Sequence, residues 1–224
     1  MKKGIRTVFN LFLAAAPFTA WFLMMGGTAG VLSSRGLESM KYFTVLSNLL
    51  EGIASLIWLA CLAAKREKHR AEVLKYIACL CVFLTFATVM VFLGPLYGYR
   101  AMFAGANLWL HLIVPLAAVF EMVFFAREDI SAPEAACSVI PVFIYGSVYL
   151  GNIIMNGRGD AKTGWNDFYG FAMWGIPVGV LIFAGICLIV FGAGLVLRRI
   201  MRKPAGPHSG QGRQNRSETG SREP

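Results

Sequence analysis

Six long apolar stretches constrain this chain more than any other feature, because each approaches the roughly 20 residues that a helix needs to cross a bilayer. The hydrophobic share of 57% and the mean hydropathy of +0.60 exceed those of an ordinary soluble domain. We therefore predict an all-α polytopic membrane protein, a bundle of six transmembrane helices within residues 1–203. The predicted helices cover residues 9–32, 42–64, 74–96, 106–125, 136–155 and 169–197. Residues 204–224 are rich in Gly, Ser, Arg and Pro and are predicted to form a disordered cytoplasmic tail.

The basic residues are distributed unequally between the two ends of the predicted bundle. Residues 2–6, 65–75, 127 and 198–203 place most of the basic groups at one end. Because Lys and Arg accumulate in cytoplasmic connections, we expect both termini to be cytoplasmic and the protein to reside in the cell membrane. The basic start of the chain is interpreted as part of an uncleaved first helix. The net charge of +9 is then explained by topology and anionic lipid, and no nucleic-acid partner is expected.

The chain offers little for a metal or for the commonest hydrolase motifs. Its five cysteines lie in or beside apolar stretches without a C-x-x-C pair, and it has three histidines. We expect buried thiols, no metal and no cofactor. Sequences typical of a serine-hydrolase elbow, a zinc protease or a phosphate-binding loop are absent.

One face of the second predicted helix is polar although the helix is otherwise apolar. Residues three, four and seven apart share a helix face, so this face carries Thr44, Ser47, Asn48, Glu51 and Ser55. Polar groups are costly in hydrocarbon and normally face the protein interior or a wet cavity. The stripe therefore predicts an internal polar site.

His111 is the residue elsewhere that matches this stripe. Thr44 and His111 both lie near the outer ends of helices that run inward, so their depths should differ by only a few ångströms. An imidazole beside a threonine hydroxyl can act as its general base, and Ser47 or Asn48 could orient the histidine or donate to an oxyanion. The alternatives are a capping or back-bonded threonine and a structural histidine bonded to a backbone carbonyl.

Three short motifs resemble a known family. Tyr42-Phe43-Thr44-x-x-Ser47-Asn48-Leu49-Leu50, His111-x-x-x-Pro115 and the segment 166–171 are similar to bacterial six-pass relatives of the androgen-induced gene 1 and androgen-dependent TFPI-regulating protein family. The resemblance implies a membrane threonine hydrolase that cleaves fatty-acyl esters. It also implies that Thr44 is the nucleophile and His111 its partner. The chain departs from animal members after the histidine and in the sixth helix.

Other polar residues allow more than one interpretation. Glu51 should be protonated or paired, and it could serve the bundle structurally, orient His111 or transfer protons. Glu121 is expected to extend toward the cytoplasmic interface, with Arg127 as a partner. Asn107 could line the cavity of His111. Asp167 could cap the sixth helix or close the cavity near Arg100.

The sequence thus predicts an integral membrane hydrolase of a lipid ester, with Thr44 as nucleophile, His111 as general base and a cavity that opens outward. A membrane lipid is the expected substrate or ligand, and no oligomeric state is predicted. Two alternatives stay open. One is a small proton-coupled transporter or channel that uses Glu51, His111 and Glu121. The other is a lipid-binding membrane protein without catalysis.

Overall fold

The computed structural model describes residues 2–26, 36–126, 129–160 and 166–202, and within these ranges the chain forms helices and no strand. Six helical spans are long and apolar enough to cross a membrane. They are built from α1 (Lys2–Met25); α2 (Phe43–Ala63); α3 (His69–Thr88), η2 (Val89–Leu93) and α4 (Gly94–Tyr97); α6 (Ala106–Leu108), η3 (Trp109–Ile113) and α7 (Val114–Phe125); α8 (Ala132–Ala136) and α9 (Val139–Asn156); and α10 (Ile176–Met201). The connections contain the 3-10 helix η1 (Gly36–Lys41) and α5 (Tyr99–Met102). The predicted all-α, multi-pass membrane fold is confirmed.

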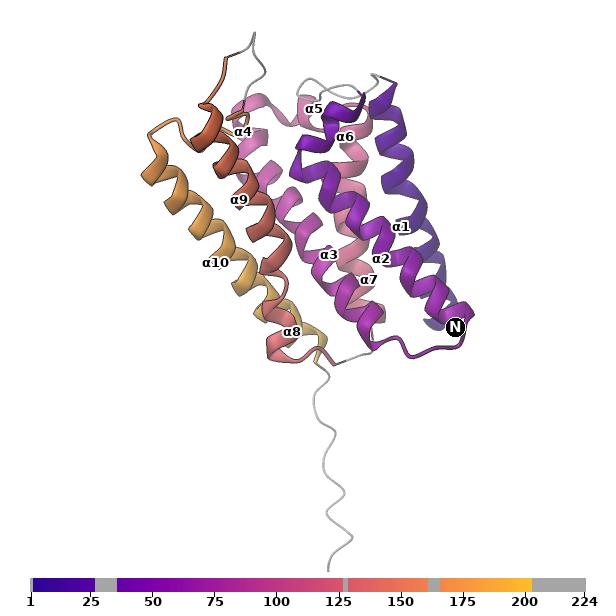
Figure 1. Ribbon diagram of the computed structural model, residues 1–224. Helices are drawn as coiled ribbons and strands as arrows, with labels where there is room; N and C mark the ends of the chain where they lie inside the picture. Colours follow the sequence, from indigo (N-terminus) through magenta and orange to yellow (C-terminus); the bar gives the residue numbers. More distant parts are fainter. Residues whose placement is uncertain (1, 27–35, 127–128, 161–165, 203–224) are drawn as a thin grey trace, which may run out of the picture.

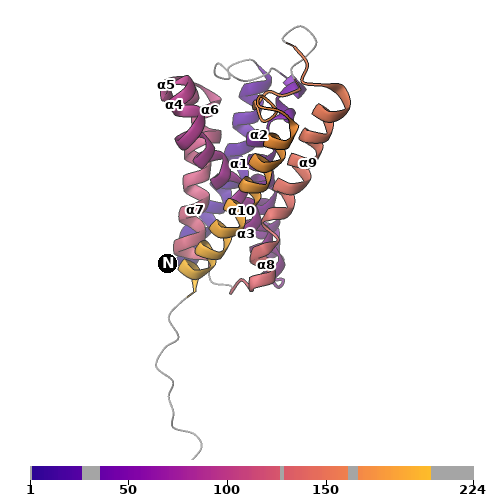
Figure 2. The ribbon, with the colours of Figure 1, turned by 90° about the vertical axis from the view of Figure 1, so that its left-hand side faces the viewer.

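Four of the spans form a closed group, and the last two lie beside it. α1 packs against α2, α2 against α3, α3 against α7, and α7 against α1 (Figure 1). α9 and α10 pack against each other, and both contact α3 (Figure 2). α1 begins and α10 ends at the same end of the bundle, which we call the terminal end; α5 and α6 lie at the other end. The closed group therefore has an interior that all four helices share.

Two spans contain a π-helical turn next to a proline. Pro95 and Pro115 have no N–H and cannot donate to the carbonyls of Val91 and His111, four residues earlier. Those carbonyls lie within η2 and η3, the two π-helical turns of the described chain. Such turns are frequent at functional sites because they alter the direction in which neighbouring side chains point. His111 is therefore carried on an irregular turn rather than on a regular α-helix.

The first helix begins earlier than the sequence predicts. α1 starts at Lys2 rather than near residue 9, and its early residues Arg6 and Asn10 are buried, with 6% and 0% of their surface exposed. The side chains of Arg6 and Asn10 face the other helices and bind Glu72 and Glu121 there. Residues 27–32, predicted to end this helix, and the tail 204–224 lie outside the described residues.

The last helix begins later than predicted. Residues 169–175 form turns, and α10 starts at Ile176 rather than at residue 169. Gly170 and Gly175 have φ angles of +72° and +99°, which favour glycine and are incompatible with a continuous α-helix. Pro177 then occupies the first turn of α10, where its missing N–H costs no helical hydrogen bond.

Candidate functional site

Thr44 and His111 line one cavity at the end of the bundle away from the terminal end. The cavity has a volume of about 450 Å³ and lies between the start of α2, the η2–α5 region, η3 and the turns before α10. Asn107 and Asp167, also predicted as site residues, line it as well. The remaining wall is mostly apolar, with Phe92, Leu93, Leu96, Met173 and Trp174. We call this space the outer cavity.

His111 is held by a backbone carbonyl. Its side chain is buried, and its Nδ1 lies 2.8 Å from the carbonyl oxygen of Met102 in α5. A carbonyl oxygen can only accept a hydrogen bond, so Nδ1 carries the proton of the neutral ring. The other nitrogen, Nε2, then has a lone pair that can accept a proton. The structural contact expected for a lone histidine is present, and it leaves the imidazole in the form that a general base requires.

The Thr44 hydroxyl is neither a cap nor bonded back along its helix. Tyr42 is the N-cap of α2 and makes no capping bond through its side chain, while Thr44 is the second residue of the helix. Among the described residues, the hydroxyl and the backbone N–H of Thr44 have no hydrogen-bond partner, and the side chain is half-buried. Thr44 and His111 therefore share the outer cavity without a direct hydrogen bond between them.

Asn48 connects the helix of Thr44 to the turn of His111. Its Nδ2 donates to the carbonyl oxygen of Thr44 at 2.8 Å and to that of Leu110 at 3.0 Å. Both amide protons are thus used, which leaves none for an oxyanion. Asn48 is fully buried, so this bridge is shielded from water. In this arrangement Asn48 links the position of Thr44 to that of the turn that carries His111.

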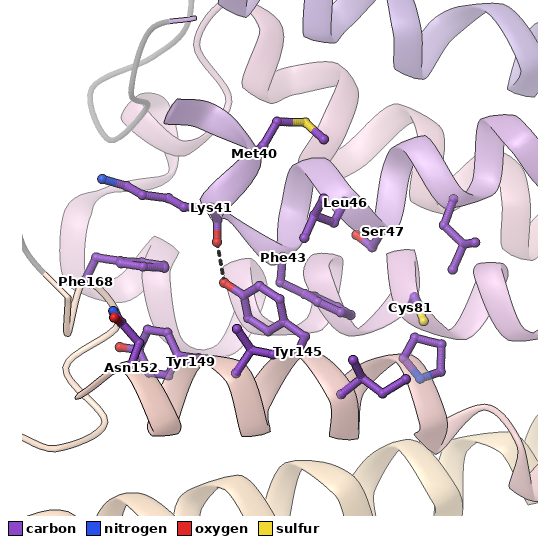
Figure 3. A pocket seen from close by; sticks show the side chains of 14 residues that line it. Met40, Lys41, Phe43, Leu46, Ser47, Cys81, Tyr145, Tyr149, Asn152 and Phe168 are labelled. Carbon is purple, nitrogen blue, oxygen red and sulfur yellow. Dashed lines mark hydrogen bonds between the residues drawn. The ribbon is translucent and has the colours of Figure 1, made fainter. Parts of the chain in front are cut away.

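Ser47 faces a different cavity. It lines a space of about 510 Å³ between α2, α3 and α9, whose lining side chains are drawn in Figure 3. Its hydroxyl lies 3.1 Å from the carbonyl oxygen of Thr44 and 3.1 Å from Thr85 Oγ1. Tyr145, on the opposite wall, donates to the carbonyl oxygen of Lys41 at 2.6 Å. The structure therefore separates Ser47 from His111, and Ser47 stabilises the contact between α2 and α3.

Asp167 organises the turns that cover the outer cavity. Its carboxylate accepts hydrogen bonds from Tyr149 Oη at 2.7 Å, from the backbone N–H of Ala172 at 3.1 Å and from Arg158 Nε at 3.2 Å. The partner is Arg158 rather than Arg100. The N-cap of α10 is Gly175, and no side chain caps this helix, so Asp167 does not cap it. Its carboxylate instead ties the turns before α10 to α9.

Tyr169 joins the same turns to α2. Its hydroxyl accepts a hydrogen bond of 3.0 Å from the backbone N–H of Phe43, the first residue of α2. Burial raises the pKa of Tyr169 to about 12, so its phenol stays protonated at neutral pH. The wall of the outer cavity beside Thr44 is therefore fixed by an uncharged group.

Glu51 and Glu121 lie apart from the outer cavity. Glu51 Oε1 is 2.9 Å from Lys75 Nζ, and Glu121 binds Arg6 Nε at 2.5 Å. Both carboxylates are fully buried. The expectation that Glu121 extends to the interface is wrong, and Arg127 lies outside the described residues. Among the described residues, no hydrogen bond links His111 to either glutamate.

Sequence reasoning missed several residues that build these sites. Met102 acts through its backbone carbonyl, which no side-chain pattern reveals. Arg6 and Lys75 were counted only as indicators of topology, although both are buried. The one available signal was the pair Glu72 and Lys75, three residues apart at the start of an apolar helix, where a shared polar face points inward.

The described residues contain no group of three or more His, Cys, Asp or Glu side chains that could hold a metal ion. All five cysteines are free thiols. Comparisons of the chain with protein-family models, with curated proteins and with solved structures each find no match. What the fold and the site define is a multi-pass membrane protein with Thr44, His111 and the polar residues Asn107, Arg158 and Asp167 in one mainly apolar cavity.

The bridge made by Asn48 can be tested by mutation. Asn48→Ala leaves the buried carbonyls of Thr44 and Leu110 without this donor, so we expect a loss of about 1–3 kcal/mol in the free energy of unfolding. Asn156→Ala removes an exposed amide bond to Asn152 and should change stability by less than about 0.5 kcal/mol. Thermal or denaturant unfolding of the detergent-solubilised proteins measures both, and equal effects of the two substitutions would contradict a structural bridge at Asn48.

Proposed function

We propose that this protein is an integral membrane hydrolase of a lipid ester, with Thr44 as nucleophile and His111 as general base. The observation that carries the proposal is the contact of His111 Nδ1 with the Met102 carbonyl. This contact places the proton on Nδ1 and leaves Nε2 with a free lone pair, on a side chain that lines the same cavity as Thr44. A hydroxyl and a basic imidazole nitrogen in one site are the minimum set for nucleophilic acyl transfer. The resemblance of the motifs around both residues to a family of membrane threonine hydrolases supports the same assignment.

The reaction would proceed in two steps. Thr44 Oγ1 attacks the ester carbonyl while its proton moves to His111 Nε2, and the protonated histidine then protonates the departing alcohol. A water molecule, activated by the same nitrogen, hydrolyses the acyl-threonine and restores both side chains. A direct bond between the two residues is not needed in the resting protein, because catalytic hydrogen bonds often form only with substrate.

The start of α2 supplies a donor for the developing negative charge. The N–H groups of a first helical turn have no acceptor within the helix, and the N–H of Thr44 has no partner among the described residues. A backbone N–H at a helix N-terminus suits a tetrahedral oxyanion, because its partial positive charge is fixed in place. The nucleophile would thereby carry its own oxyanion donor.

The substrate is a lipid with an ester within reach of the outer surface. The apolar wall of the outer cavity suits an acyl chain, and the pair formed by Arg158 and Asp167 at the covering turns suits a polar group. An acyl chain that enters the outer cavity from the bilayer does not have to pass through water. This assignment gives the class of substrate, a fatty-acyl ester in the membrane.

The two alternatives differ in what they require. A lipid-binding protein without catalysis would use the same cavity, and a covalent reaction at Thr44 separates it from a hydrolase. A proton-coupled transporter would need Glu51, His111 and Glu121 along one path. Glu51 and Glu121 instead share Lys75, whereas His111 is bound to Met102. We therefore favour the hydrolase.

A covalent probe tests the assignment of the nucleophile. We expect a fluorophosphonate or a β-lactone with a long alkyl chain to label the purified protein and Thr44→Ala to abolish the labelling. His111→Ala should slow labelling by at least about 100-fold, because it removes the base.

Ser47→Ala provides the matched control. Ser47 is also a hydroxyl residue on α2, but it faces the other cavity, so its loss should leave the labelling rate within a few-fold of the wild type. Labelling that persists in Thr44→Ala, or that Ser47→Ala abolishes, would contradict the proposal.

We also propose that both termini are cytoplasmic, which places the outer cavity at the external face of the cell membrane. The support is the concentration of basic residues at the terminal end, including the exposed Lys65, Arg66 and Arg199. A cysteine introduced at Glu67 should be inaccessible to a membrane-impermeant maleimide added to intact cells, and one introduced at Arg158 should react. The reverse pattern would invert the topology.

A further inference from the structure

Five charged side chains form a buried cluster between α1, α2, α3 and α7. We call it the ionic cluster, and its members are Arg6, Glu51, Glu72, Lys75 and Glu121. Each is at most 6% exposed, and three of them are fully buried. Isolated charges at this depth are strongly unfavourable. The number of cations relative to the number of carboxylates therefore decides which protonation states the cluster can adopt.

Arg6 forms one half of the ionic cluster. Its two terminal nitrogens bind the two oxygens of Glu72 at 2.6 and 2.5 Å, and its Nε binds Glu121 Oε1 at 2.5 Å. Trp58 Nε1 donates to Glu72 Oε1 at 2.8 Å, and Asn10 Nδ2 donates to Glu121 Oε1 at 3.2 Å. Glu72 is therefore fully satisfied as a carboxylate by one guanidinium and one indole.

Lys75 forms the other half. Its ammonium donates to Glu51 Oε1 and to Ser55 Oγ, each at 2.9 Å, and it lies 3.3 Å from Glu121 Oε2. Ser55 in turn donates to Glu51 Oε1 at 3.3 Å. Glu121 thus contacts two cations, whereas Glu51 contacts one. Of the three carboxylates, Glu51 is the least compensated.

The charges of the ionic cluster do not balance. Two cations face three carboxylates, which leaves one excess negative charge if all three glutamates are ionised. Lys68 approaches Trp58, with its ammonium 5.7 Å from the ring centre, but it is partly exposed and forms no ion pair with the cluster among the described residues. An uncompensated charge in a low-dielectric interior favours uptake of a proton.

The unpartnered atoms in this region are all acceptors. Four buried side-chain atoms of the described residues have no hydrogen-bond partner, and each is an oxygen: Asn10 Oδ1, Asn48 Oδ1, Glu51 Oε2 and Glu121 Oε2. Lys75 approaches Glu121 through this Oε2, at 3.3 Å, but approaches Glu51 through Oε1, at 2.9 Å. Asn48 precedes Glu51 by three residues on the same face of α2. The region therefore has more hydrogen-bond acceptors than donors.

We propose that the ionic cluster is a proton-binding site that holds one proton on Glu51. The proton neutralises the excess charge and turns Glu51 Oε2 into a hydroxyl donor on the helix face that carries the free Asn48 Oδ1. Glu51 contacts Lys75 from α3 and Ser55 from its own helix, and Glu121 from α7 shares Lys75 with it. The buried thiols of Cys79 and Cys81, on α3, are the other titratable groups that interact electrostatically with Glu51. α1 contributes Arg6 and Asn10 through Glu121. The site does not depend on the proposed hydrolase activity.

Infrared spectroscopy detects this proton directly. The full-length protein is measured at neutral pH in a maltoside detergent, which contains no ester or carboxyl group, and in both H₂O and D₂O. We expect the C=O stretching band of one protonated carboxylic acid, separate from the carboxylate bands and shifted by deuterium. If the wild-type protein shows no such band, the proposal is overturned, and no variant is needed to decide this.

Variants test where the proton lies and why. Glu51→Gln and Glu121→Gln each leave two cations facing two carboxylates, so both should lose the band. Glu38→Gln, which changes an exposed residue paired with Lys41, should retain it. A band that persists in Glu51→Gln or in Glu121→Gln would contradict the charge argument. A band that appears only when sodium is replaced by choline would assign the site to a metal cation and overturn the proton.

Discussion

The contact of Arg6 with Glu72 and Glu121 is the interaction on which the arrangement of the first four spans depends. One guanidinium from α1 binds carboxylates from α3 and α7, and Lys75 extends the ionic cluster to Glu51 on α2. Breaking a buried ion pair costs about 3–5 kcal/mol because the remaining charge has no solvent. In a bilayer, where helices gain little from apolar contact alone, such pairs restrict how the helices can pack. The cluster therefore fixes which faces of α2 and α7 point inward.

The polar face of α2 serves both internal sites. Its first residue, Thr44, lines the outer cavity, Asn48 bridges α2 to the turn of His111, and Glu51 and Ser55 belong to the region of the ionic cluster. Ser47, Asn48, Glu51 and Ser55 are buried and Thr44 lines a cavity, as the cost of polar groups in hydrocarbon demands. The irregular turn before Pro115 completes the arrangement, because it frees the Leu110 carbonyl for Asn48 and directs His111 toward Met102.

The sequence allowed the helices and the polar face of α2 to be predicted because both follow from local periodicity. The similar depths of Thr44 and His111 were predicted from the number of residues between each of them and its helix end. Both residues line the outer cavity. Pairings across the chain could not be predicted in this way. Glu121 binds Arg6, which is 115 residues away, and no local spacing indicates that partner. Met102 acts through its carbonyl, so its side chain carried no signal. The turns before α10 were assigned to a helix because their aromatic residues are apolar, although Gly170 and Gly175 prevent one.

The central proposal is that Thr44 on α2 reacts with esters because the imidazole of His111 lines the same cavity and can act as its base. Tandem mass spectrometry of the protein, quenched with acid during reaction with a long-chain acyl ester, tests this most directly. The account predicts an acyl group on the Thr44 hydroxyl and none on Ser47. The fraction of protein that carries this group should be larger for esters whose acyl-threonine intermediate is hydrolysed slowly. An acyl group on Ser47 or on a cysteine would contradict the account. So would ester hydrolysis by the Thr44→Ala variant without any acyl adduct.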